Sequence, residues 1–142
     1  MEDKTQETLP LAERILDEMA EALIYADRDG IIRRWNRAAE TMFGYPAGHA
    51  LGQSLDLIIP ENLRAAHWRG FNAAMLSGAT RLHGRPTLTR ASHRSGSRLY
   101  VEMSFALVAD ESGTAVGSVA VARDVTERVE REKAEARRTA NP

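Results

Sequence analysis

The chain has 142 residues, of which 43% are hydrophobic and 27% charged, and this length and composition suit one soluble globular domain. Its 19 basic and 20 acidic residues leave a formal net charge of −1, which provides no electrostatic footprint for DNA or an anionic membrane. It contains no cysteine, which excludes disulfides, thiolate metal sites, cysteine nucleophiles and flavin photochemistry through a cysteine adduct. We therefore expect no direct nucleic-acid partner and no membrane partner.

Residues 1–21 are expected to form a polar tail followed by a short amphipathic helix. The tail lacks the apolar segment of a signal peptide, so we expect a cytoplasmic protein. In the helix, Leu11, Ile15 and Met19 follow helical spacing, with Leu16 beside them. Such a stripe exposes apolar surface if the domain stays alone, so we predict a homodimer formed through this helix. The alternative is that the helix packs on the sheet of its own chain.

A hairpin and several helices are expected next. Two apolar runs, over 22–27 and 31–35, are separated by an Asp-Gly pair that is typical of a tight turn between strands. Asn36 is placed to cap a short helix that ends before Gly44. After a region rich in glycine and proline, the longest central helix is predicted over 61–76.

Three strands are expected in the remainder, over about 85–93, 98–109 and 114–123. The middle strand is the clearest, because large apolar residues alternate with smaller or polar ones, which buries one face of a sheet. Its alternating apolar residues are Leu99, Val101, Met103, Phe105 and Leu107. The stretch after Thr126 is almost wholly charged and predicts a terminal helix.

In this order the elements predict an α+β fold, with a five-stranded antiparallel sheet, helices on one face, and flanking N- and C-terminal helices. The main domain would span residues 22–127, and residues 128–142 would form a charged helix or linker. Val129 is the only strongly apolar residue after Thr126. Together with the preceding Val125 it cannot sustain a long coiled-coil seam.

Four segments resemble motifs of the PAS family and occur in the same order as in that family. They are IYADRDGIIRRWNRAAETMFGY, GQSLDLIIP, HRSGS and ARDVTE. One departure is Ser95, at a turn position where the family usually has aspartate. The resemblance implies the PAS fold and a role in sensing and signal transduction. No enzyme is expected, because no nucleophile–histidine pair, phosphate-binding glycine loop or carboxylate cluster has a diagnostic spacing.

His67 is the most informative candidate site residue. By helical spacing it shares a face with Leu63, Phe71 and Ala74, so it points where core-facing residues point. Gly70 flanks this face and costs on the order of 1 kcal/mol relative to alanine inside a helix, which leaves space for a planar cofactor. A lone histidine on an apolar helix face is, however, more often a hydrogen-bonding core residue than a ligand. The spacing leaves both interpretations open.

The segment IPENLRAAH, residues 59–67, resembles the segment that carries the proximal iron ligand in the heme-binding PAS domains of bacterial oxygen sensors. These sensors are the rhizobial sensor kinases and the direct oxygen sensor phosphodiesterases. The following SGATRLHGR keeps their spacing without a gap. The resemblance implies that His67 is the metal ligand of a b-type heme and that the domain senses a diatomic gas: oxygen, nitric oxide or carbon monoxide.

The same resemblance suggests further cofactor contacts. Arg81 matches a position that contacts a heme propionate, Arg85 matches the distal methionine of the phosphodiesterases, and Thr87 matches an arginine that binds oxygen. Residues 85 and 87 are expected to lie on one face of a strand, so Arg85 is the candidate distal donor; the alternative is an exposed arginine beside Pro86. We expect the opposite wall to include Leu82, Met103, Phe105 and small residues of the last strand, Ser118, Ala120 and Ala122.

Two points remain open after this comparison. The first is the cofactor, because a PAS domain without heme would serve in dimerisation or protein interaction, or would hold a small apolar or carboxylate ligand. The second is the recipient of the signal, which we expect to be a signalling effector protein in two-component signalling or the regulation of transcription.

Trp68, the neighbour of the candidate iron ligand His67, is expected to pack beside Met75 on the same helix.

Overall fold

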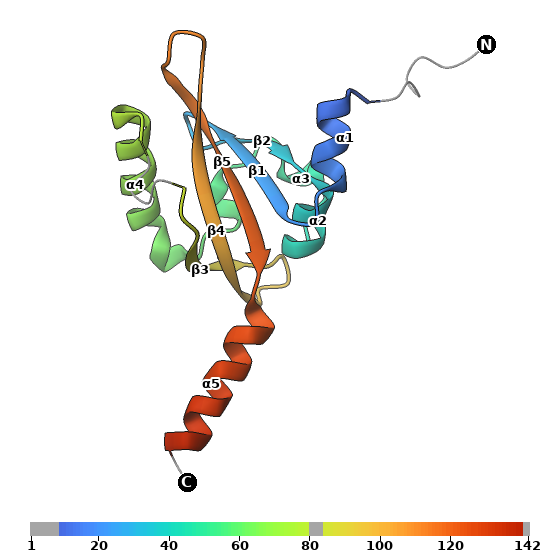
Figure 1. Cartoon of the computed structure of the whole chain (residues 1–142), viewed down its shortest axis with the longest axis vertical. Helices are drawn as coiled ribbons and strands as arrows, with labels where there is room; N and C mark the ends of the chain where they lie inside the picture. Colours follow the sequence, from blue (N-terminus) through green and yellow to red (C-terminus); the bar gives the residue numbers. More distant parts are fainter. Residues whose placement is uncertain (1–8, 80–83, 141–142) are drawn as a thin grey trace, which may run out of the picture.

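The computed structural model describes residues 9–79 and 84–140, and within them one antiparallel sheet has the strand order β2-β1-β5-β4-β3 (Figure 1). This arrangement confirms the predicted α+β fold with five antiparallel strands. The elements in chain order are α1 (Leu11–Glu18), β1 (Ala22–Asp27), β2 (Ile32–Trp35), α2 (Arg37–Phe43), α3 (Ala47–Ala50), η2 (Leu55–Leu57), η3 (Glu61–Leu63), α4 (Arg64–Ser77), β3 (Thr87–Ser92), β4 (Arg98–Ala109), β5 (Ala115–Asp124) and α5 (Thr126–Ala140).

The turn between β1 and β2 is organised by the carboxylate of Asp27. This group accepts hydrogen bonds from the backbone N–H groups of Asp29 and Ile31, at 2.9 and 3.1 Å, and from Arg33 Nε at 2.8 Å. Gly30 has a φ of 76°, which a residue with a side chain rarely adopts. β2 begins one residue later than predicted, because Ile31 forms an isolated bridge with Ser54 instead.

Asn36 caps α2 as predicted and also connects it to the preceding segments. Its side chain is almost completely buried, at 3% exposure. Oδ1 accepts hydrogen bonds from the N–H groups of Leu23 and Ala39, and Nδ2 donates to the carbonyl oxygens of Leu16 and Glu21. Every polar atom of this side chain is therefore satisfied.

The two faces of β4 differ as the sequence pattern predicts. Leu99, Val101 and Met103 are buried in the main core on the face covered by the helices. Tyr100 lies on the opposite face but is also buried, because it packs against Val125 and Val129 at the start of α5. The terminal helix thus covers one end of the outer face and then projects away from the domain (Figure 1).

β3 is shorter than predicted and begins at Thr87 rather than at residue 85. Pro86 has no N–H group to give to a strand ladder, and Gly84 turns the chain with a φ of 80°. Arg85 therefore precedes the strand, and our expectation that residues 85 and 87 share one strand face is wrong.

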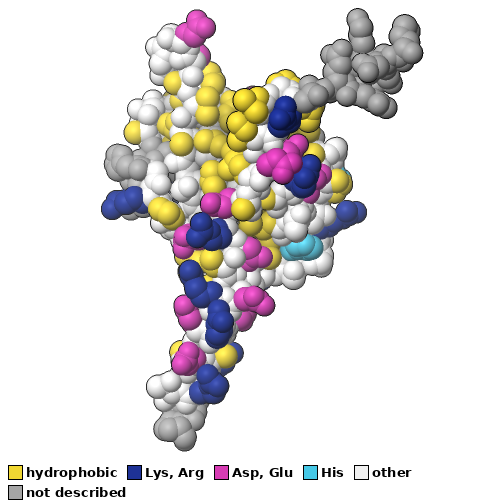
Figure 2. Space-filling view, turned by 45° about the vertical axis from the view of Figure 1, so that its right-hand side comes forward, with side chains coloured by type: hydrophobic (Ala, Val, Ile, Leu, Met, Phe, Trp, Pro, Cys, Tyr) yellow, Lys and Arg dark blue, Asp and Glu magenta, His cyan; other side chains and the backbone are white. Residues whose placement is uncertain are grey.

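α1 buries no residue and leaves an apolar stripe uncovered, since Leu11 and Ile15 are 64% and 54% exposed. Glu13 pairs with Arg34 of β2 at 3.1 Å, which ties the polar side of the helix to the sheet. Figure 2 shows hydrophobic side chains gathered over the upper half of this side of the molecule and mixed charges along the projecting terminal helix. Within residues 9–79 and 84–140, no helix has both the length and the apolarity to cross a membrane.

Candidate ligand-binding site

α4 carries the residues that define the candidate site. The 3₁₀ turn Glu61–Leu63 leads into this helix, so the predicted long helix is present with a tighter first turn. It ends at Gly78, which adopts the left-handed conformation and donates its N–H to the carbonyl of Ala74. One face of α4 is turned toward the sheet, and the other is exposed to solvent.

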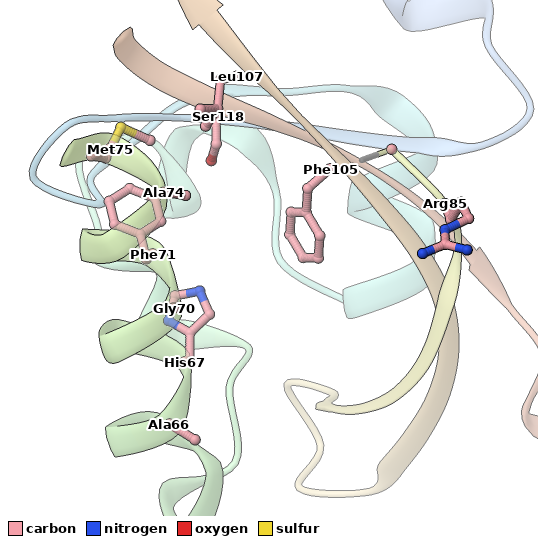
Figure 3. A pocket seen from close by; sticks show the side chains of 11 residues that line it. Ala66, His67, Gly70, Phe71, Ala74, Met75, Arg85, Phe105, Leu107 and Ser118 are labelled. Atoms are coloured by element: carbon pink, nitrogen blue, oxygen red, sulfur yellow. The ribbon is translucent and has the colours of Figure 1, made fainter. Parts of the chain in front are cut away.

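Two neighbouring cavities lie between α4 and the sheet, a smaller one of about 230 Å³ and a larger one of about 340 Å³. The larger volume falls within the range of small-molecule sites. Figure 3 shows the smaller cavity, with His67 and Phe71 on α4 and with Phe105 and Ser118 on the sheet side. The residues that line both cavities are Ala66, His67, Phe71, Phe105 and Ser118.

His67 projects from α4 at the wall that both cavities share (Figure 3). Its ring lies edge-on to Trp68, with centroids 4.6 Å apart, and is tilted against Phe71 at 5.9 Å. Nδ1 is buried and has no hydrogen-bond partner among the described residues. Burial lowers the pKa of the imidazole below 6.5, and the negative charge of Asp56 only partly opposes this. The environment therefore favours a neutral imidazole, the form that binds a metal.

Trp68 has neighbours that the sequence did not predict. Its Nε1 donates to Asp56 Oδ1 at 2.8 Å. A Cβ atom built on Gly30 would lie 2.2 Å from the indole ring, so Trp68 packs directly against the β1–β2 turn. These contacts hold the back of α4, next to His67, against the hairpin. The predicted packing beside Met75 stays a prediction; Trp68 packs against the core cluster to which Met75 belongs.

The structure brings together six of the eight residues that the sequence suggested as cofactor contacts. His67 and Phe105 line both cavities, and Arg85 lines only the smaller one. Arg81 and Leu82 lie outside the described residues. The remaining three predicted contacts line the larger cavity and are Thr87, Met103 and Ala120.

Sequence reasoning missed the residues that enclose the larger cavity from the β1 side. Ile24 and Ala26 of β1 line it together with apolar residues that precede α4: Leu55, Ile58 and Ile59. The signal in the sequence was the apolar run at residues 55–59 within the glycine- and proline-rich region. Because this run is separated from His67 along the chain, the sequence alone did not indicate that the two lie close together.

Three observations show that these residues fit a planar, metal-containing group such as heme. The first is the buried, unpartnered Nδ1 of a neutral His67. The second is Gly70, where an added Cβ would meet no atom within 4 Å, so a flat group can approach the helix backbone. The third is the largely apolar wall of both cavities, which suits a macrocycle. Phe105 lies in the space between α4 and the sheet, and an entering group would displace its partly buried ring (Figure 3).

The sequence model of a family described as the PAS fold matches residues 16–130. Sensor protein FixL of Bradyrhizobium diazoefficiens is 26% identical over 113 residues, which cover 80% of this chain and 22% of FixL. Oxygen sensor protein DosP of Escherichia coli K12 is 27% identical over 77 residues, which cover 54% of this chain and 10% of DosP. The chain thus spans less than a quarter of either relative.

Solved structures with the same fold extend this comparison. The PAS domain of a protein from Colwellia psychrerythraea has a TM-score of 0.72 at 22% identity, covering 82% of this chain and 95% of that one. An RNA-binding light-oxygen-voltage receptor has a TM-score of 0.70 at 22% identity, covering 98% of this chain and 41% of the receptor. At these identities the likeness concerns the fold alone.

Proposed function

Because the chain belongs to the PAS family and is a sensory domain of that family, we propose that it binds b-type heme through His67 and senses a diatomic gas: oxygen, nitric oxide or carbon monoxide. The similarity to FixL and to the oxygen sensor DosP confirms the resemblance to oxygen sensors that the sequence suggested. Binding of heme and the identity of the gas are the proposed steps.

The observation that carries the proposal is the state of His67. A buried polar atom without a partner destabilises a folded protein, by about 1–3 kcal/mol in typical cases, unless something else in the structure or function requires it. Here Nδ1 is in that state while the ring lines an apolar cavity on each side. A cofactor that the imidazole ligates gives this side chain a function that core packing alone does not explain.

Each neighbouring residue has a role in this proposal. When bound, heme would supply an iron centre that binds a diatomic gas. His67 would hold the iron, Gly70 would let the ring approach α4, and Met103, Phe105 and Ala120 would form the opposing apolar wall. Arg81 would contact a heme propionate, as the resemblance implies, and Leu82 would add an apolar contact. Arg85 is the distal donor that the sequence suggested, and Thr87 lines the larger cavity.

β4 connects this site to the terminal helix. Met103 and Phe105 face the larger cavity, and Tyr100 on the other face of the same strand packs against Val129. Lys133 of α5 donates a hydrogen bond to the Tyr100 hydroxyl and lies over its ring. We propose that a change in the cavity shifts β4 and, through it, α5. A coupling free energy of about 1–3 kcal/mol would be enough to pass the signal to an effector protein that contacts α5.

An absorption spectrum tests the proposal. Protein expressed with a heme supply is expected to show a Soret band, and His67→Ala is expected to lose it. His49→Ala is the matched control, because His49 is exposed and stacks on Tyr45 away from the cavities. A colourless wild-type protein, or a band that His67→Ala leaves unchanged, would overturn the proposal.

A heme-free sensor of a small apolar ligand is the second candidate. It is favoured by the division of the space into two cavities, with the Phe105 ring at their shared wall. Each cavity by itself suits a small ligand rather than a macrocycle. Native mass spectrometry of purified protein without a Soret band would then show an added organic mass.

We also propose that two copies of the chain associate through α1. Leu11 and Ile15 are exposed on a helix that buries none of its residues against its own chain. Changing both to glutamate is expected to convert a dimer into a monomer in light scattering after size exclusion. Leu76→Glu is the control, because Leu76 is 84% exposed on another helix. A mass that the double variant leaves unchanged would contradict this proposal.

A further inference from the structure

Ser118 occupies the sheet wall of the candidate site. It lies on β5, where its register partners are Ala26 of β1 and Leu107 of β4. It points to the helix-covered face and is 8% exposed. Together with His67, it is one of the two polar side chains among the residues that line both cavities. Figure 3 shows its hydroxyl oxygen pointing from β5 into the space in front of α4.

The Ser118 hydroxyl has no hydrogen-bond partner in residues 9–79 and 84–140. The residue as a whole is largely buried, but its oxygen atom is not fully enclosed by protein, so it is reached from the cavities that Ser118 lines. The next inward-facing residues on β5, Ala120 and Ala122, show that alanine suits this face of the strand. Packing on its own therefore gives no reason for an oxygen atom at position 118.

We propose that Ser118 is the residue that determines ligand specificity at this site, by hydrogen bonding to the gas that binds in the cavity. This inference rests on the proposed heme function and adds to it a group on the sheet opposite His67. A hydroxyl rotates freely and can donate to an acceptor atom that enters the cavity. Bound oxygen accepts hydrogen bonds more strongly than carbon monoxide does, so the hydroxyl favours oxygen.

This assignment differs from the one that the sequence suggested. Arg85 precedes β3 and its residue is exposed, whereas Ser118 is fixed in the middle of the sheet by backbone pairing on both sides. A short side chain on a central strand holds its polar atom in a narrower range of positions than a long side chain next to a turn. Ser118 is therefore better suited than Arg85 to discriminate between two ligands of similar size.

Ser118→Ala tests the inference in heme-loaded protein. Its affinity for oxygen is expected to fall roughly three- to tenfold, the loss of one hydrogen bond, while its affinity for carbon monoxide changes less than about twofold. Ser104→Ala is the matched control: Ser104 is on the adjacent strand and pairs with Val121 on the outer face. It is expected to change neither affinity.

Thermal unfolding of the ligand-free protein provides a second measurement. Because the hydroxyl has no partner to lose, Ser118→Ala is expected to unfold at the same temperature as the wild type or higher. A clear drop would show that the hydroxyl already stabilises the fold, and an unchanged ratio of oxygen to carbon monoxide affinity would show that it does not touch the gas. Either result overturns the inference. A wild-type protein without a Soret band instead overturns the proposed function, and this inference with it.

Discussion

Asn36 and His67 are both polar side chains at helices that pack on the sheet, but their surroundings differ. Asn36, at the start of α2, accepts two hydrogen bonds and donates two. His67, on α4, has a buried Nδ1 with no partner in the described part of the chain. The core beside α2 has the polar atoms of Asn36 fully hydrogen-bonded, whereas the α4 side has two cavities and the unpartnered nitrogen of His67. We therefore expect changes at α2 to act on stability and changes at α4 to act on the proposed ligand binding.

The largest effect is expected where the satisfied network is broken. Asn36→Ala would leave two backbone N–H groups and two carbonyl groups without partners, and should cost about 4 kcal/mol of unfolding free energy. Asn36→Asp keeps an acceptor for the two N–H groups but turns a second, charged oxygen toward the carbonyl oxygens of Leu16 and Glu21, so it should cost at least as much. Urea denaturation measures both values. If Asn36→Ala costs less than about 1 kcal/mol, the network does not carry the stability of this half of the domain.

The contact between Trp68 of α4 and the β1–β2 turn is expected to give the next largest effect. An alanine at Gly30 would meet the Trp68 ring at 2.2 Å and would require a φ of 76°, so Gly30→Ala should cost about 3 kcal/mol. Gly113 has a similar φ of 88° with no atom near an added Cβ, so Gly113→Ala should cost only about 1 kcal/mol. Equal unfolding free energies for the two variants would show that Trp68 does not press on the turn.

The sequence predicted the local features of both halves but only part of their contact. The alternation along β4, the Asn36 cap and the inward face of His67 follow from residue spacing, which records how each element meets a core. The Trp68–Asp56 hydrogen bond joins residues that are not in one helix, and no periodicity reports it. Whether the Ser118 hydroxyl finds a hydrogen-bond partner depends on the residues around it in the fold, and spacing along the strand does not report these residues.

Gly70→Ala is expected to have a smaller effect, which stabilises the ligand-free protein and weakens heme binding. Gly70→Ala should raise the unfolding free energy of the ligand-free protein by about 1 kcal/mol, because alanine favours the helix and the added Cβ meets open space. The same methyl group would occupy the approach to α4, so heme affinity should fall. Gly48→Ala is the control, since it also fills open space on a helix but lies outside both cavities. Unchanged heme affinity in Gly70→Ala would place the cofactor elsewhere.

The smallest effect concerns acid stability of the hairpin. Partial burial would raise the pKa of Asp27, but the hydrogen bonds from Arg33 and from the N–H groups of Ile31 and Asp29 hold it below 3.8. A carboxylate with a lowered pKa contributes stability above its unfolded value, and this contribution is lost as the pH falls through the lowered value. Asp27→Asn should therefore lose less stability than the wild type as the pH falls below about 3.8. Parallel curves of unfolding free energy against pH would contradict this.

Imidazole rescue of a ligand-deleted variant tests most directly the claim that His67 holds a cofactor. His67→Gly protein mixed with heme is expected to lack the wild-type Soret band and to regain it when free imidazole fills the space of the missing side chain, whereas His49→Gly should keep the band throughout. A His67→Gly protein that binds heme with the wild-type spectrum before imidazole is added would contradict the account.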